Sequence, residues 1–327
     1  MEQINEELIP NLKGINDVTR RVLQKVQHVA AQTDGLDGIS TGFKRLDNVL
    51  SGFKEGDVYT IGGRPSMGKT AFAMSLINNI AVEQHVPTLL FSMESNAARC
   101  AHRIIANHCD ISFTKILNAT FDQHDWERLD KQISQVVDSP LHIDETASLS
   151  VDDICDKAKE CVIKHGIKII FIDYLQLITT PYRANRTRND DVAEIMHKIK
   201  GLARELSIPI VLLSQLNRCP ENREGIEGKR PMLYDLRDSG TIEEDSDAII
   251  FLHRPEFYHI YQDDNGRDLH NMAQIIIKKN RTGYTGEFLL RFDGEYCRFS
   301  EPKNEALSSR HIFSQQDEDS LPNPLPF

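Results

Sequence analysis

The chain has 327 residues, enough for one large α/β domain or two small ones, and 40% of them are hydrophobic, which is ordinary for a globular protein with a core. No apolar run reaches the roughly 18 to 20 residues that a membrane span needs, and the acidic start "MEQINEELIP" lacks the apolar stretch of a secretory signal. A net charge of −11 argues against a simple basic DNA-coating protein, but a local basic lining would still bind nucleic acid.

The six cysteines are scattered and form no CxxC pair. This spacing favours reduced thiols over disulfides or a zinc site, so we expect a cytoplasmic protein. They are Cys100, Cys109, Cys155, Cys161, Cys219 and Cys297.

The first predicted element is an amphipathic helix over residues 16–32, within an N-terminal segment that we expect to end near residue 35. One face carries apolar side chains at helical spacing, namely Val18, Val22, Val26, Val29 and Ala30. Such a stripe has to be buried. Two alternatives stay open: the helix packs on its own domain, or on a neighbouring copy of the chain.

Five short segments that are nearly all apolar follow, at residues 57–63, 88–94, 167–173, 208–215 and 247–253. Strands buried on both faces of a parallel sheet have this composition, and the intervening segments are mostly long enough for crossover helices. Beyond residue 273, short strands separated by glycine turns predict antiparallel hairpins. We therefore expect an α/β domain over residues 36–302, with a mostly parallel central sheet flanked by helices, and a disordered acidic tail over 303–327.

The stretch "GRPSMGKT" fits the phosphate-loop pattern GxxxxGK[ST] and lies between a predicted strand and a predicted helix. Backbone N–H groups of such a loop face a phosphate, and the helix N-terminus adds its dipole. The lysine would reach the β- and γ-phosphates, and the threonine hydroxyl would hold Mg²⁺. The sequence thus predicts ATP and Mg²⁺ as cofactors, bound by Gly63, Arg64, Pro65, Ser66, Met67, Gly68, Lys69, Thr70 and Ala71.

Hydrolysis also needs a carboxylate near Mg²⁺ and a group that orients water. Asp173 and Glu94 each end an apolar strand, where α/β sheets place their ligands. Gln215 ends another and could sense a γ-phosphate through its amide, as could Asn217 just beyond it. Each of these residues could instead be an ordinary polar strand end. The presence of two such acids beside a phosphate loop makes that explanation the weaker one.

Seven ordered motifs together resemble the RecA-like motor domain of replicative DNA helicases of the DnaB family. The resemblance covers about residues 36–302, and its motifs lie at residues 38–47, 63–70, 91–95, 169–178, 212–218, 235–254 and 278–286. It implies a P-loop NTPase that forms a homohexameric ring, hydrolyses ATP, translocates 5′ to 3′ on single-stranded DNA and unwinds duplex at a replication fork.

By position, the resemblance makes Lys69 and Thr70 the nucleotide-binding pair, with Thr70 and Asp173 as metal ligands. It makes Glu94 the catalytic base and Gln215 the sensor of the γ-phosphate. Lys279 and Arg281, in "IIIKKNRTGYTG", would reach the γ-phosphate bound to the adjacent subunit. Lys278 alternates with Lys279 along the strand and is expected to face the other way.

The resemblance also implies two DNA-binding loops. Arg237, Asp238 and Gly240 would lie on a loop that grips the DNA backbone, so that binding is independent of base sequence. The stretch "YRANRTRN" falls on a second pore-facing loop, where Arg183, Arg186 and Arg188 would meet DNA. A solvated charged loop is the alternative for these three arginines.

The helical N-terminal collar that family members carry, and through which they meet primase, has no counterpart in this sequence. The helix over residues 16–32 fits the linker that packs against the next subunit in the family. Primase and a helicase loader are therefore partners that the resemblance leaves open. Two other functions are alternatives: a RecA-type strand-exchange protein, and a nucleotide-gated DNA-binding assembly without unwinding. The order of the motifs and the linker-like helix favour the helicase.

Overall fold

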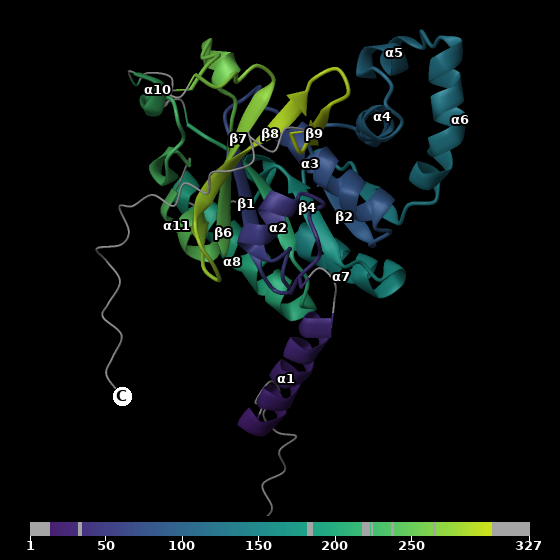
Figure 1. Cartoon of the computed structure of the whole chain (residues 1–327). Coiled ribbons are helices and arrows are strands. Elements are labelled where there is room, and N and C mark those ends of the chain that lie inside the picture. Colours follow the sequence, from purple (N-terminus) through teal and green to yellow (C-terminus); the bar gives the residue numbers. More distant parts are fainter. Residues whose placement is uncertain are drawn as a thin grey trace, which may run out of the picture.

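A nine-stranded sheet forms the centre of the computed structural model, which describes residues 14–31, 35–181, 186–217, 223, 225–236, 239–263 and 266–302 (Figure 1). The strands lie in the order β3-β2-β4-β5-β1-β6-β7-β8-β9. Their bounds are β1 (Val58–Gly63), β2 (Thr88–Ser92), β3 (Leu141–Asp144), β4 (Ile169–Asp173), β5 (Ile210–Gln215), β6 (Ala248–His253), β7 (Met272–Asn280), β8 (Gly286–Asp293) and β9 (Arg298–Ser300). The first six are parallel, and the last three pair antiparallel, as the sequence predicts.

The helices are α1 (Ile15–Ala31), α2 (Lys44–Leu50), α3 (Lys69–Ile77), α4 (Ala97–His108), α5 (Phe113–Asn118), α6 (Gln123–Val137), α7 (Val151–His165), α8 (Arg188–Leu206), α10 (Gly225–Gly228) and α11 (Ser239–Asp245). A π-helical turn, η2 (Asn78–Glu83), prolongs α3, and short 3₁₀ turns lie at η3 (Leu175–Leu177), η4 (Leu233–Asp235) and η5 (Pro255–Tyr258). Capping boxes begin α6, α7 and α8, where a side-chain oxygen at the cap accepts from the backbone three residues later.

Two hydrophobic cores cover the two faces of the sheet. Successive side chains of a strand point to opposite faces, so Ile169 and Phe171 of β4 join one core while Ile170 and Ile172 join the other. The first core packs against α2, α3 and η2, and the second against α7, α8 and α11. Burial on both faces is the physical reason that these strands read as continuous apolar runs.

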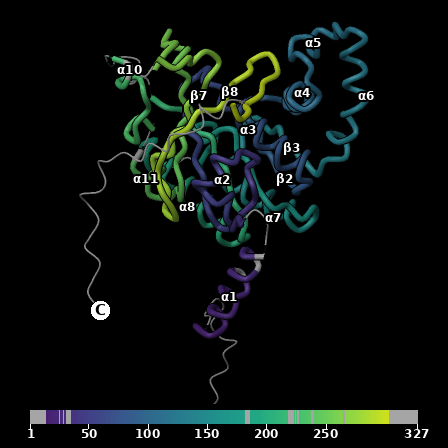
Figure 2. Tube along the Cα trace, viewed as in Figure 1, coloured from purple at the N-terminus to yellow at the C-terminus, as the bar shows by residue number. Residues whose placement is uncertain are grey.

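The five strands predicted over the parallel part are confirmed, each beginning within two residues of its expected start. The sequence did not single out β3, a four-residue strand at the sheet edge. Its side chains are only half-buried, and its sequence "LHID" lacks the apolar run that marks the central strands. The chain reaches it through α4, α5 and α6, which form a separate lobe beside the sheet (Figure 2).

Helix α1 agrees with its predicted bounds within one residue and projects away from the body as a separate arm (Figure 1). Three side chains of its apolar stripe are exposed to solvent, Val18 at 37%, Val22 at 54% and Val26 at 58%. The structure therefore shows this stripe uncovered by the chain's own domain.

None of the helices in the described part of the chain is long and apolar enough to cross a membrane.

The two ends of β6 lie beside two different groups of charged residues. At its C-terminal end Leu252 pairs with Gly63, the first residue of the phosphate loop. At its N-terminal end Ala248 pairs with Asn280, the last residue of the antiparallel β7. Four residues of strand span roughly 13 Å, so the cations around Asn280 lie where the parallel strands begin, and the phosphate loop lies where they end. These two sides are called the N-terminal and the C-terminal edge of the sheet.

His253 ends β6 as a buried imidazole, with 3% of the residue exposed, and its ring stacks on Tyr258 at 5.5 Å between centroids. Burial, and secondarily the charge of Arg230, lowers the pKa of His253 to about 4 from 6.5. Between those values the unfolded chain binds a proton that the folded chain does not. Stability should therefore fall as the pH drops from 6.5 towards 4.

We predict that His253→Gln removes this part of the pH dependence. The wild type should lose about 2 kcal/mol of unfolding free energy relative to the variant between pH 7.5 and pH 5. Urea unfolding of both proteins at the two pH values measures the difference, and other titrating groups cancel in the comparison. Parallel pH profiles for the two proteins would show that His253 does not titrate as described.

Candidate functional site

The phosphate loop has the backbone that its sequence predicts. It leaves β1 at Gly63 and enters α3 at Lys69, and Gly68 between them has a φ of 91°. This conformation favours glycine, and a Cβ at Gly68 would also crowd the ring of Phe299, at 3.2 Å. The amide of Phe72 donates to the carbonyl of Gly68 over 2.8 Å, which starts the helix directly behind the loop.

Lys69 is held inside the loop by backbone carbonyls. Its Nζ donates to the oxygen of Gly63 over 2.7 Å and to that of Arg64 over 3.2 Å. Burial lowers the pKa of Lys69 to about 8, while the carboxylates of Asp173 and Glu94 act in the other direction. A lysine held this way carries a positive charge that phosphate oxygens would stabilise better than carbonyls do.

Asp173 and Thr70 meet at the end of β4. The hydroxyl of Thr70 donates to Oδ2 of Asp173 over 3.0 Å, and Asp173 is 2% exposed. Burial, with a contribution from Glu94, raises the pKa of Asp173 to about 6. A hydroxyl and a carboxylate are the hard oxygen ligands that Mg²⁺ takes beside nucleotide phosphates, so the pair fits the predicted metal role.

Glu94 and Gln215 reach the same place from the two strands on either side. Ser92 pairs with Asp173 across β2 and β4, and the amide of Met93 donates to the carbonyl of Asp173 over 3.0 Å, which places Glu94 just beyond. Gln215 pairs with Gly63 across β5 and β1, and Gln176 accepts from its backbone amide over 3.1 Å.

A cavity of about 580 Å³ collects these groups. It is lined by five of the predicted catalytic and metal-binding residues, Lys69, Thr70, Glu94, Asp173 and Gln215, and by further residues of the phosphate loop. This volume is typical of a small-molecule pocket. The structure therefore places these five residues around one cavity within a single chain, while their roles stay predictions.

Sequence reasoning missed several residues around this cavity. Arg103 lines it from α4 and donates to the hydroxyl of Ser95 over 3.2 Å. Arg254, just after β6, donates to the carbonyl of Ser66 over 3.4 Å and lies 4.1 Å from the ring centre of Phe292. A signal existed for Arg103, because α4 begins three residues after Glu94 and its inner face must turn towards the pocket. Arg254 and Phe292 meet only through the fold.

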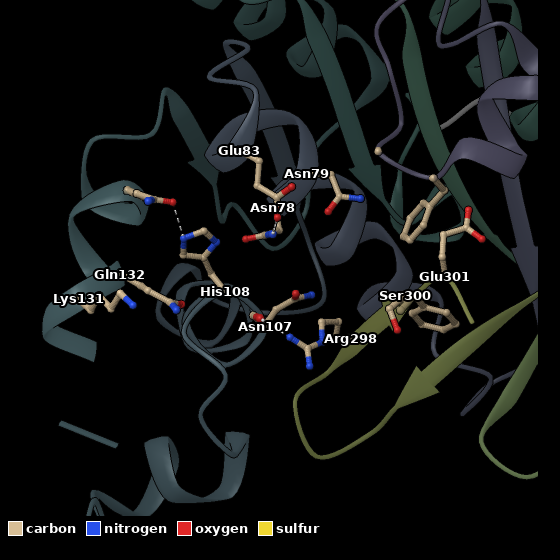
Figure 3. A pocket seen from close by; sticks show the side chains of 14 residues that line it. Asn78, Asn79, Glu83, Asn107, His108, Lys131, Gln132, Arg298, Ser300 and Glu301 are labelled. Carbon is tan, nitrogen blue, oxygen red and sulfur yellow. Dashed lines mark hydrogen bonds between the residues drawn. The ribbon is translucent and has the colours of Figure 1, made fainter. Parts of the chain in front are cut away.

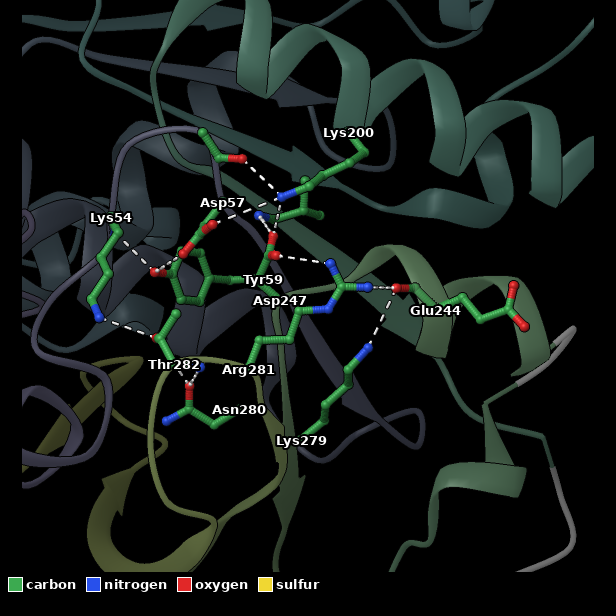
Figure 4. A network of polar contacts seen from close by, with 12 residues as sticks. Lys54, Asp57, Tyr59, Lys200, Glu244, Asp247, Lys279, Asn280, Arg281 and Thr282 are labelled. Carbon is green, nitrogen blue, oxygen red and sulfur yellow. Dashed lines mark hydrogen bonds and ion pairs between the residues drawn. The ribbon is translucent and has the colours of Figure 1, made fainter. Parts of the chain in front are cut away.

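Lys279 and Arg281 lie elsewhere, around the start of β6, as Figure 4 shows. Lys279 donates to the backbone carbonyls of Glu243 and Glu244 at the end of α11. Arg281 donates to the carbonyl of Glu244 and, over 3.3 Å, to Oδ1 of Asp247. Lys278 lies at a register shift between β6 and β7, and the charged groups that act on its pKa, Arg230 and Glu227, differ from those that act on Lys279.

The predicted DNA-binding residues are only partly described. Arg237, Asp238 and Arg183 lie outside the described residues. Arg186 pairs with Glu194 and donates to the carbonyl of Asp190 over 2.8 Å. Arg188 donates to the carbonyl of Gln176 over 3.2 Å.

Gly240 lies in the first turn of α11, and a Cβ there would meet no described atom within 4 Å. No packing contact among described residues therefore calls for a glycine at this position. DNA binding by all six residues stays a prediction.

A second cavity, of about 530 Å³, is lined mainly by residues of η2, α4, α6 and β9 (Figure 3). Its walls are polar, with carboxamides from Asn78, Asn107 and Gln132. Asn78 donates to Glu83 over 3.0 Å, and Asn107 donates to Ser75 over 3.0 Å. None of the residues predicted for catalysis lines this cavity, so it is separate from the nucleotide pocket.

Comparison with known proteins gives consistent matches. The family model described as the DnaB-like helicase C-terminal domain matches residues 38–301. Among curated proteins, replicative DNA helicase DnaB of Geobacillus stearothermophilus is 35% identical over 88% of this chain and 62% of its own length. The Pasteurella multocida protein of the same name is 39% identical over 81% of this chain and 56% of its own length.

Two solved structures are similar in fold and sequence. One, described as an ATPase domain, superposes with a TM-score of 0.80 at 34% identity, over 90% of this chain and all of that one. A DnaB-like replicative helicase, described with its interactions with primase, gives 0.76 at 34% identity, over 89% of this chain and 67% of that one. The chain spans about three-fifths of the length of the curated relatives it matches.

We predict that Asp173→Asn stabilises the nucleotide-free protein while it impairs binding of the Mg²⁺–ATP complex. A carboxyl whose pKa rises on folding destabilises the fold above that pKa, here about 6, by on the order of 1–3 kcal/mol. The amide keeps an acceptor for Thr70 and carries no charge.

Thermal unfolding without nucleotide should therefore give a higher midpoint for the variant at pH 8, and a smaller difference or none at pH 4. The exposed carboxylate of Asp130, changed in the same way, serves as the control and should leave the midpoint unchanged. A variant midpoint below that of the wild type at pH 8 would contradict the prediction.

Proposed function

The chain belongs to the family of DnaB-like helicase C-terminal domains, and from that premise we propose that it is an ATP-driven 5′ to 3′ DNA helicase that acts as a homohexameric ring. Single-stranded DNA is its proposed substrate track, and ATP with Mg²⁺ its proposed cofactors. Primase and a helicase loader are further proposed partners.

One observation carries the proposal of a ring. Lys279 and Arg281 stand at the N-terminal edge of β6, and the chain's own phosphate loop stands at the C-terminal edge. The packed sheet between them keeps both cations from their own nucleotide. They can act on a γ-phosphate only where a second copy presents its phosphate loop to this edge.

The proposed chemistry divides between two subunits. One supplies the phosphate loop and Lys69, with Thr70 and Asp173 as the residues that would hold Mg²⁺, whose charge would neutralise that of the phosphates. Its Glu94 accepts the proton of the attacking water, and its Gln215 bonds the γ-phosphate. The neighbour supplies Arg281 and Lys279 to the same phosphate. Loss of the γ-phosphate then removes the anion that joins the two copies.

Helix α1 gives independent support for contact between copies. Its exposed valine stripe is apolar surface that a stable helix has to bury, and the chain's own domain leaves it uncovered (Figure 1). We propose that it packs on a neighbouring copy, the second of the two alternatives that the sequence left open.

We predict that Arg281→Ala leaves ATP binding largely intact and lowers DNA-stimulated turnover by about 10³- to 10⁵-fold, the range for arginines supplied in trans in other NTPases. The reason is that Arg281 lies outside the cavity that binds nucleotide and enters the reaction only from the adjacent copy. Nucleotide affinity and ATPase rate, each with and without single-stranded DNA, measure the two effects.

The matched experiment mixes Glu94→Ala subunits with Arg281→Ala subunits. Each type supplies what the other lacks, so mixed rings should regain activity that neither has alone. Near-normal ATPase activity of Arg281→Ala by itself would refute the assignment. A wild-type protein without ATPase activity, whether DNA is present or absent, would refute the helicase proposal as a whole.

We predict that Arg237→Ala weakens binding to single-stranded DNA uniformly across sequences and reduces the salt slope of that binding by about one counterion. A backbone-gripping arginine neutralises a phosphate without reading a base. Fluorescence anisotropy of labelled oligonucleotides over a salt series gives the slope. Arg99→Ala, an exposed arginine on α4, is the control; an unchanged slope for Arg237→Ala would rule out its role.

A further inference from the structure

Asp247 is a buried carboxylate at the N-terminal edge of the sheet, one residue before β6, and its side chain is 9% exposed. Oδ2 accepts from the backbone amide of Val58 over 2.7 Å and also accepts from Nζ of Lys200. Oδ1 accepts from Arg281 over 3.3 Å (Figure 4). Three elements, β1, α8 and the end of β7, therefore meet on one carboxylate.

Arg281 is attached to the same residue a second time. Its backbone amide donates to the carbonyl of Asp247 over 2.8 Å, so the main chain and the guanidinium are held together. The other Nη donates to the carbonyl of Glu244 at the end of α11. The side chain nevertheless remains 46% exposed, which leaves part of its hydrogen-bonding surface facing outward.

The two anchors suit a guanidinium that must later bind an anion. Arginine has five N–H donors in a planar fork, and fixing one side of the fork aims the other. Carbonyls at a helix C-terminus carry the negative end of the helix dipole, so they attract the cation without neutralising it. Lys200 pairs with Asp247 and also lies 3.8 Å from Oδ1 of Asp57, so two cations and two carboxylates balance one another around Arg281.

We propose that Asp247 is a positioning residue for Arg281, one that fixes the direction in which the arginine reaches the neighbouring subunit's γ-phosphate. The proposal rests on the assignment of Arg281 under the proposed function. Asp247 itself is buried, at the opposite end of β6 from the chain's own phosphate loop. Its effect on catalysis passes through Arg281.

The same arrangement ties the two cations to α11, the helix that follows the proposed DNA-binding loop in the chain. Lys279 and Arg281 both contact carbonyls at the end of α11, and α11 begins at Ser239, directly after Arg237 and Asp238 in the chain. A change in the position of α11 therefore moves the surface on which the two cations rest.

The test is the isosteric variant Asp247→Asn in the full chain. It should lower kcat for DNA-stimulated ATP hydrolysis on the order of 10²-fold, the cost of a misplaced catalytic group, and leave KM for ATP within about twofold. Ser246→Ala is the matched control. Ser246 is buried beside Asp247 and bonds Thr60 over 2.7 Å, so its loss weakens the same corner of the fold without touching Arg281.

The ATPase activity of mixed oligomers distinguishes a positioning role of Asp247 from a merely structural one. Asp247→Asn subunits keep a sound phosphate loop and lose only their action on the neighbour. They should regain activity when mixed with Glu94→Ala subunits, whose Arg281 is intact. They should gain nothing from Arg281→Ala subunits, which share the same defect.

Activity of Asp247→Asn equal to that of Ser246→Ala, or equal rescue by both partners, would overturn the proposal. The pair Glu94→Ala with Arg281→Ala separates the two inferences. If that pair fails to complement, the action of Arg281 in trans is wrong; if it complements and Asp247→Asn does not follow the pattern, only the role of Asp247 is wrong. Should the asparagine variant not fold, Asp247→Glu keeps the charge, displaces it by about one bond and must show the same pattern of rescue.

Discussion

The antiparallel pairing of β7 with β6 is the constraint on which the rest of the site depends. Parallel strands all end at one edge of the sheet, and that edge holds the phosphate loop with its acids and amide. By running back along β6, β7 ends at the other edge and delivers Lys279 and Arg281 there. One strand reversal therefore places two charged groups of residues, the two half-sites, at opposite ends of the parallel strands, and under the proposed function each group completes its site with a neighbouring copy.

The two half-sites solve the same electrostatic problem differently. Around the phosphate loop, Lys69 and Asp173 are buried. Burial lowers the pKa of Lys69 and raises the pKa of Asp173, so it favours the neutral form of each. Phosphate oxygens and Mg²⁺ would relieve both costs, so the pocket is built for a charged ligand. At the opposite edge the charge is satisfied within the fold, since Asp247 and the end of α11 hold Arg281 ready. The first half-site gains stability from its ligand, whereas the second is ordered in advance.

The sequence carries the first half-site almost completely, because phosphate loops and strand-end acids are local patterns whose spacing is fixed by one turn or one strand. The parallel sheet was predictable for a similar reason, as burial on both faces leaves continuous apolar runs. What could not be read are contacts that pair distant segments. Arg254 meets Phe292, and Asp247 meets Lys200 and Arg281, only once the sheet is assembled. The edge strand β3 was missed because half-burial leaves no apolar run, although pairing with β2 defines it in the fold.

Order in the second half-site has a consequence for assembly. Fixing a free arginine side chain costs up to about 2 kcal/mol of rotamer entropy, which would otherwise be lost when two subunits meet. In this fold the rotamer entropy of Arg281 is lost during folding. The hydrogen bond from its backbone amide to the carbonyl of Asp247, together with the buried carboxylate, offsets that cost. In the proposed ring, contact between copies would have to supply only the apolar burial of α1 and the attraction of the cations for a γ-phosphate. Because the second contribution would exist only while ATP is bound, the strength of the proposed interface would follow the state of the nucleotide. The contacts of both cations with the end of α11 would then link that state to this helix.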